Sequence, residues 1–201
     1  MKINKKVFII CIIILIISAV IIYKNMIKKS KNGNNMNSQE IVDYILNAKE
    51  YKANVSIYVN SNKNSNKYIL KQVYNQDGEC IQEVIEPANI AGVKIVKKDG
   101  NIKVENTALN LSAIFENYKS LGENALDLNI FIEDYKKYDK SFYEENEKEI
   151  IMKTKSSNQN KYTENKILYI NKEEKIPTKM IVEDNNQNMT INIQYNEIEL
   201  N

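Results

Sequence analysis

Hydrophobic residues form one long unbroken run near the start of the chain and recur at regular spacings afterwards. The run extends from Val7 to Tyr23 and follows three lysines in the first six residues. A helix rises ~1.5 Å per residue, so the segment reaches about 25 Å, the short end of what crosses a bilayer. The pattern predicts a single transmembrane helix over residues 7–23. The side chains expected to anchor it include Val7, Phe8, Ile14, Ile17, Val20 and Tyr23.

Two kinds of processing would remove this segment. Signal peptidase prefers small residues before its cut, and Ser18-Ala19 supply some, but Ile17 stands where a small residue is preferred and the apolar run continues. Lipoprotein processing would act at Cys11, which Ile9-Ile10 precede in place of a small residue. Both alternatives stay open, and the pattern favours an uncleaved signal anchor.

The segments around the anchor set the expected topology. Residues 1–6 form a basic stub, expected in the cytoplasm, and residues 24–36 are rich in Lys and Asn without periodicity, which predicts a flexible linker. Lysines flank the run on both sides, but long domains translocate despite their charge. We therefore expect residues 37–201 to form one extracytoplasmic domain of a single-pass protein in the cell membrane.

The pattern after the linker predicts a short helix followed by strands. Apolar residues from Ile41 to Ala48 share one helical face, and Asn37 with Glu40 forms a capping pattern ahead of it. The apolar period then changes to two, with strand candidates over residues 55–59, 68–74, 80–86, 92–98 and 102–105. Asp77-Gly78 and Asp99-Gly100 lie between such runs and are typical of tight hairpin turns.

Two later stretches have apolar residues at i, i+3, i+4 and i+7, the spacing of a helical face. The first comprises Leu111, Ile114, Phe115 and Tyr118, and the second comprises Leu128, Phe131, Ile132 and Tyr135. Strand patterns return over residues 148–154, 161–171, 176–183 and 189–200. Because this order contains no βαβ alternation, it predicts an α+β fold in which one antiparallel sheet carries its helices on a single face.

The last predicted strand changes its parity. Its apolar residues from Met189 to Tyr195 occupy odd positions, whereas Ile198 and Leu200 occupy even ones. An uninterrupted strand would place these last two on the opposite face. A β-bulge near Asn196-Glu197 would return them to the core, and we favour this interpretation because bulges commonly curve the rims of barrel-like sheets. In the alternative, the strand leaves the sheet and presents both residues to a partner.

The composition removes most catalytic chemistry. The chain contains no His, Arg or Trp. Without imidazole it has no Ser-His or Cys-His couple and no His ligand for zinc. Acidic clusters such as Glu133-Asp134 and Glu144-Glu145 are interleaved with lysines, which is typical of solvated surfaces. We therefore predict that the protein is not an enzyme, and we expect no cofactor, no metal site and, at a net charge of +2, no nucleic acid partner.

The candidate binding residues are apolar. Tyrosines are frequent in the predicted strands and have an apolar body with a polar tip, although strand tyrosines more often serve packing. The second predicted helical stretch could plug a half-open sheet, dock a partner or cover the core. The candidates for a partner or cavity surface are Leu128, Phe131, Ile132, Tyr135, Ile198 and Leu200.

The order of these segments resembles a known family. The stretches KYILKQVYN, EVIEPANIAG and LNIFIEDY, followed by the closing strands from Ile167 to Asn201, are similar to the germination lipoprotein GerS group of clostridia. That group resembles the lipoprotein-carrier fold shared by LolA, LolB and RseB. The resemblance covers about residues 37–201 and implies a curved, incomplete antiparallel β-barrel with helices packed in its concave face. The chain departs from the group in having no lipobox before Cys11.

The resemblance also implies a function. It indicates a non-catalytic, membrane-anchored partner protein of sporulation and germination, which binds and supports a spore-cortex-modifying N-acetylmuramoyl-L-alanine amidase. A protein with this role would lie in the cell membrane or in the forespore membrane facing the intermembrane space. The alternative is a carrier or sensor like LolA or RseB, which binds lipid or lipoprotein acyl chains in the half-barrel. A large apolar cavity would favour the carrier, and a hollow filled by side chains would favour the partner protein.

Overall fold

The computed structural model describes residues 36–60, 64–116 and 126–201. Within them, Ser38–Asn201 form one unit with two α-helices, α2 (Ser38–Leu46) and α4 (Leu128–Lys137), and a 3-10 turn, η1 (Thr107–Leu109). The strands are β1 (Tyr51–Asn60), β2 (Ser65–Tyr74), β3 (Cys80–Glu86), β4 (Val93–Lys98), β5 (Asn101–Asn106), β6 (Leu111–Phe115), β7 (Phe142–Glu145), β8 (Glu149–Asn160), β9 (Thr163–Asn171), β10 (Ile176–Glu183) and β11 (Met189–Leu200).

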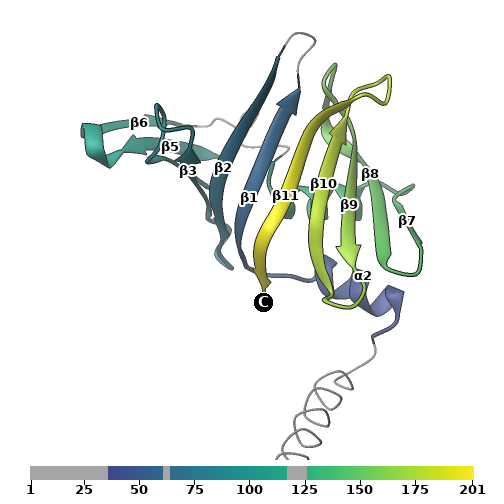
Figure 1. Ribbon diagram of the computed structural model, residues 1–201. Coiled ribbons are helices and arrows are strands. Elements are labelled where there is room, and N and C mark those ends of the chain that lie inside the picture. Colours follow the sequence, from purple (N-terminus) through teal and green to yellow (C-terminus); the bar gives the residue numbers. More distant parts are fainter. Residues whose placement is uncertain (1–35, 61–63, 117–125) are drawn as a thin grey trace, which may run out of the picture. The chain divides into compact units, whose positions relative to one another are not determined.

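All of these strands pair in one antiparallel sheet, in the order β6-β5-β4-β3-β2-β1-β11-β10-β9-β8-β7 (Figure 1). Each half of the sheet is a meander of sequence neighbours, and the pairing of β1 with β11 joins the halves. The sheet stays open, with β6 and β7 at its edges. The predicted α+β architecture of one unclosed antiparallel sheet with helices is confirmed.

The predicted anchor falls outside the described residues. Residues 7–23, the stub before them and nearly all of the 24–36 linker belong to the undescribed part of the chain. In the part that the structure describes, none of the helices has the length and apolar character needed to cross a membrane.

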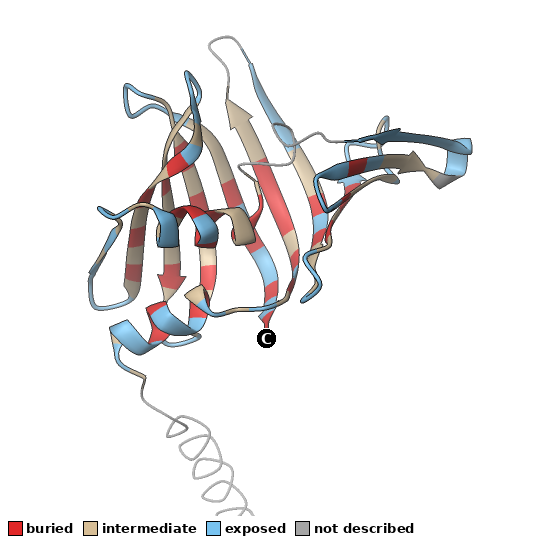
Figure 2. Ribbon diagram, turned by 180° about the vertical axis from the view of Figure 1, so that it is seen from behind, coloured by how far each residue is buried: buried red, intermediate tan, exposed pale blue. Residues whose placement is uncertain are grey.

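The core lies on one face of the sheet, under α2 and α4 (Figure 2). Strand parity brings Val55 and Ile57 of β1 onto this face together with Leu168 and Ile170 of β9, and all four are at most 1% exposed. From the helices, Ile41, Val42, Ile45, Leu128, Phe131 and Ile132 pack into the same core. Burying one such side chain fully is worth about 1.5–3 kcal/mol, so this face dominates the stability of the domain.

The predicted β-bulge is confirmed. Val55 pairs with Tyr195 and Asn54 pairs with Glu197, so Asn196 is the extra residue in β11. Ile198 and Leu200 thereby return to the core face, where each is 8% exposed. The Asn196 side chain donates a 3.0 Å hydrogen bond from Nδ2 to Ser56 Oγ, so the bulged residue is tied to the neighbouring strand.

The helix predicted over residues 111–118 is wrong. Leu111–Phe115 form strand β6, which pairs with β5 from Asn106↔Leu111 to Ile102↔Phe115, while Tyr118 lies outside the described residues. Asn110, directly before this strand, has φ 51° and turns the chain back. Over only five residues, apolar side chains at 111, 114 and 115 do not distinguish a helix from a strand. The open backbone groups of β5 decide between them, because a paired strand satisfies these groups and a helix does not.

Candidate partner-binding site

Helix α4 is tied to the sheet at its beginning by a buried carboxylate. Asp127, directly before the helix, is 1% exposed, and its Oδ2 lies 2.5 Å from Lys97 Nζ of β4. Its Oδ1 accepts a hydrogen bond from the Gln82 side chain of β3. The backbone N–H of Leu128 donates to the Tyr51 hydroxyl at 3.3 Å, so the first turn of α4 is also held by β1.

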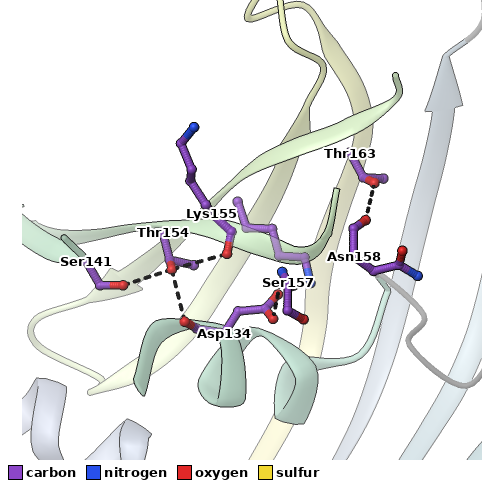
Figure 3. A network of polar contacts seen from close by, with 8 residues as sticks. Asp134, Ser141, Thr154, Lys155, Ser157, Asn158 and Thr163 are labelled. Carbon is purple, nitrogen blue, oxygen red and sulfur yellow. Dashed lines mark hydrogen bonds and ion pairs between the residues drawn. The ribbon is translucent and has the colours of Figure 1, made fainter. Parts of the chain in front are cut away.

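A second buried carboxylate ties the other end of α4 (Figure 3). Asp134 Oδ2 lies 2.6 Å from Lys166 Nζ of β9, and both side chains are at most 2% exposed. Asp134 Oδ1 accepts a 3.1 Å hydrogen bond from the Ser157 backbone N–H, and the Asp134 carbonyl accepts one from Thr154 Oγ1 at 3.3 Å. Because a buried charge is costly without its partner, these two ion pairs fix the position of α4 on the sheet.

The electrostatics around Asp127 keep its neighbours protonated. Burial, together with the Asp127 carboxylate, raises the pKa of Tyr51 and of Tyr195 well above the ordinary tyrosine value. Burial also raises the pKa of the Cys80 thiol, and the Asp127 charge adds to the effect. The hydroxyl of Tyr195 is buried and has no hydrogen-bond partner among the residues that the structure describes. This cluster therefore presents neutral hydroxyls and an unreactive thiol, which suits a structural role.

The candidate residues on α4 lie mainly in the core. Leu128 and Phe131 are fully buried, Ile132 is 6% exposed, and only Tyr135 is half-buried, with its ring centroid 6.0 Å from that of Phe131. The remaining two candidates, Ile198 and Leu200, are also buried in the core, at the end of β11. The side chains of α4 thus occupy the hollow of the sheet.

The most exposed large apolar side chains of the described residues lie elsewhere, on β6 and the turn before it. Leu109, Leu111 and Ile114 are 62–65% exposed, and Phe115 is 44% exposed. We call these four residues the β6 edge. Figure 1 shows β5 and β6 standing well away from β7–β10. Residue spacing did not predict this surface, because it assigned the stretch to a helix whose apolar face would be covered. The absence of any charge in Leu111–Phe115 was the available signal.

On the face of the sheet opposite the core, lysine side chains lie over aromatic rings. There, Lys179 lies 3.9 Å from the ring centroid of Tyr169, and Lys67 lies 5.9 Å from that of Tyr58. Long lysine stems cover apolar surface while their ammonium groups stay in water. Lysine side chains therefore cover the rings of Tyr169 and Tyr58, in contrast to the β6 edge.

Open grooves on the domain have mixed polar linings. One groove of about 510 Å³ is bordered by Lys140, Lys153, Glu183 and Phe142. Another, of about 420 Å³, lies beside Lys97 and Asp127. Throughout the described ranges 36–60, 64–116 and 126–201, no group of three or more Cys, Asp and Glu is placed to hold a metal ion. These linings do not resemble an apolar tunnel for an acyl chain.

Solved structures define the class of fold. The chain is similar to a chain in the structure of the CwlD amidase from Clostridioides difficile in complex with the GerS lipoprotein, at 22% identity and a TM-score of 0.53, covering 84% of this chain and 98% of that one. An uncharacterized conserved protein from Thermus thermophilus matches at 12% identity and a TM-score of 0.52, covering 83% and 88%. A LolA superfamily protein from Nitrosomonas europaea, NE2245, matches at 13% identity and a TM-score of 0.42, covering 83% and 94%.

This chain thus shares its fold with the chain that it matches in the CwlD–GerS structure, in line with the sequence resemblance to the GerS group. The comparison with curated proteins gives no match. A family model, "Sporulation protein YdcC-like", matches residues 5–201, and the chain belongs to this family.

Proposed function

We propose that this chain is a non-catalytic partner protein of sporulation that binds and supports a spore-cortex-modifying N-acetylmuramoyl-L-alanine amidase. The observation that carries the proposal is the β6 edge, a run of exposed apolar side chains that includes the three most exposed large apolar residues of the described part of the chain. A concentration of exposed apolar side chains on one edge strand is typical of interaction sites. Membership of a sporulation family and the likeness to a structure that contains an amidase with GerS support the choice of partner.

The filled hollow supports a partner protein over a lipid carrier. An acyl chain could enter only if α4 left the sheet, since Leu128 and Phe131 occupy that space. Leaving would break the ion pairs Asp127–Lys97 and Asp134–Lys166, both of which are buried. The cost of exposing four desolvated charged groups and an apolar helix face opposes such an opening.

We also propose that residues 7–23 anchor the protein and hold the domain outside the cytoplasm. The support is the length and apolar character of this segment, together with the linker that follows it. An anchored partner of this kind would concentrate the amidase at the membrane surface that faces the cortex.

The test is direct binding between the full chain, kept in mild detergent, and the amidase encoded in the same genome. We expect a complex of defined stoichiometry by light scattering. The double substitution Leu111→Ser/Ile114→Ser should weaken it at least tenfold. The control is Phe142→Ser on the opposite edge strand, which removes a similarly exposed apolar side chain and should leave affinity unchanged. Absence of any complex, together with acyl lipid retained by the purified chain in native mass spectrometry, would replace the proposal with the carrier function.

A further inference from the structure

We infer that β6 binds its partner by strand addition: an extended segment of the partner protein pairs with the outer edge of β6 and lengthens the sheet. This inference rests on the proposed function, since it specifies how the partner is held. It follows from three features of strand β6. These are its backbone register, the absence of charged residues and proline that would block pairing, and the alternation of its side chains.

The register identifies which backbone groups of β6 point outward. Asp99 and Gly100 both have positive φ, 51° and 77°, so β4 and β5 are joined by a two-residue hairpin flanked by the pair Lys98↔Asn101. In such a hairpin the flanking pair exchanges both hydrogen bonds, and bonded pairs then alternate along the strands.

From that flanking pair onward, alternate residues of β5 form their backbone hydrogen bonds with β4, and the residues between them form theirs with β6. The residues of β5 that face β6 are Ile102, Val104 and Asn106, and their partners in β6 are Phe115, Ala113 and Leu111. The backbone N–H and C=O groups of Ser112 and Ile114 consequently point to the outer edge. Within the described residues, β6 is the end of the strand order, so no strand pairs with these groups.

The two edges of the sheet differ in protection. Edge strands of soluble proteins usually carry charges or proline that block pairing with another chain. At the β7 edge, Glu144 and Glu145 provide such charges and form ion pairs with Lys153 and Lys172. Leu111–Phe115 contain no charge and no proline, and all five residues are exposed. The β6 edge is therefore the edge at which a further strand can add.

The side chains of β6 specify the chemistry of the added segment. Leu111, Ala113 and Phe115 share one face of the strand and continue the apolar row of Ile102 and Val104 on β5. Ser112 and Ile114 lie on the other face, beside Glu105 and Lys103. A segment that extends the sheet needs apolar side chains at alternate positions on the first face, and it tolerates polar ones on the second. The expected ligand is an extended partner segment about as long as β6, with apolar residues at every second position.

The test uses substitutions that affect only the outer edge, in the full chain with the cognate amidase. Ser112→Pro removes an outward N–H while leaving the hydrogen bonds to β5 in place, because proline is tolerated at an edge whose N–H faces solvent. Ile114→Lys keeps the N–H but adds a charge at the edge. The matched control, Ser112→Thr, keeps the N–H and favours strand structure. Circular dichroism establishes that each variant is folded.

We expect Ser112→Pro and Ile114→Lys each to weaken amidase binding at least tenfold, and Ser112→Thr to bind like the wild type. In hydrogen exchange by NMR, amidase should protect the amides of Ser112 and Ile114, whereas Ala113 should be protected already in the free chain. Folded Ser112→Pro that binds with wild-type affinity would overturn strand addition while leaving the proposed function intact. A chain that dimerises, and that Ser112→Pro makes monomeric, would assign the edge to a second copy instead. A wild-type chain that binds no amidase would remove the proposed function and this inference together.

Discussion

The buried ion pair between Lys166 and Asp134 allows a quantitative test of how α4 is held. Replacing Lys166 with Met removes the ammonium group 2.6 Å from Asp134 Oδ2 and leaves a carboxylate that is 2% exposed. Removing one partner of a buried pair costs about 3–5 kcal/mol, chiefly because the remaining charge is desolvated and unpaired. A domain of this size is stable by about 5–15 kcal/mol, so Lys166→Met should remove a large part of its stability.

The assay is urea denaturation of residues 37–201, followed by near-ultraviolet circular dichroism of the tyrosines. Lys153→Met is the matched control, because Lys153 lies at the same 2.6 Å from Glu144 while the two side chains are 34% and 52% exposed. An exposed pair contributes at most about 1 kcal/mol. In the double variant Lys166→Met/Asp134→Asn, the charge disappears and the introduced amide oxygen can still accept from the Ser157 N–H. We therefore expect it to recover more than half of the loss.

This account of α4 is wrong if Lys166→Met lowers the free energy of unfolding no more than Lys153→Met does. It is also wrong if the double variant is less stable than Lys166→Met alone. Either result would mean that the apolar face of α4, and not the buried charge, fixes the position of the helix.

Three further predictions follow from the same core and from the N-terminal segment. Tyr195→Phe removes a buried hydroxyl that has no hydrogen-bond partner within the described part of the chain, and it should be neutral or stabilising in the same urea assay. Tyr51→Phe loses the hydrogen bond from Leu128 and should cost about 1 kcal/mol, and the reverse order would contradict the hydrogen-bond assignment. Leu200→Ala should cost about 1–2 kcal/mol, limited by fraying at the end of β11, and an unchanged midpoint would place Leu200 outside the core. Intact mass of the membrane-extracted protein should correspond to an uncleaved chain, and a start near Val20 or at a lipid-modified Cys11 would exclude the signal anchor.

Local pattern was sufficient for most strands and for α4. Stretches in which apolar and polar residues alternate are bounded by turn residues. As a result, β3, β10 and β11 begin and end at the predicted residues. Asp99-Gly100 formed the predicted hairpin because both positions adopt positive φ, which Gly adopts freely and Asp tolerates. Even the bulge at Asn196 was predictable, since a change of parity in an apolar strand has few physical solutions.

The burial of lysine side chains could be predicted only in part from the sequence. Lys166 has the same parity as Leu168 and Ile170, and this parity places it on the inward face of β9. The inward position of Lys166 could therefore have been predicted from its spacing. Its partner, Asp134, is contributed by a helix 32 residues earlier in the chain, and no local spacing relates the two. Such a pair is recognised only when the packing of α4 on the sheet is known.

The sequence by itself determined most of the helices and strands, the open antiparallel class and the lack of imidazole chemistry, because these depend on residue type and on spacing between near neighbours. The tertiary structure decided that Leu111–Phe115 pair with β5 as an edge strand, and that the apolar face of α4 is buried while the β6 edge is exposed. Both outcomes depend on which distant backbone and side-chain groups compete for the same space. A five-residue apolar stretch is compatible with both a helix and a strand. It becomes a strand when an unpaired neighbouring strand supplies hydrogen-bond partners for its backbone.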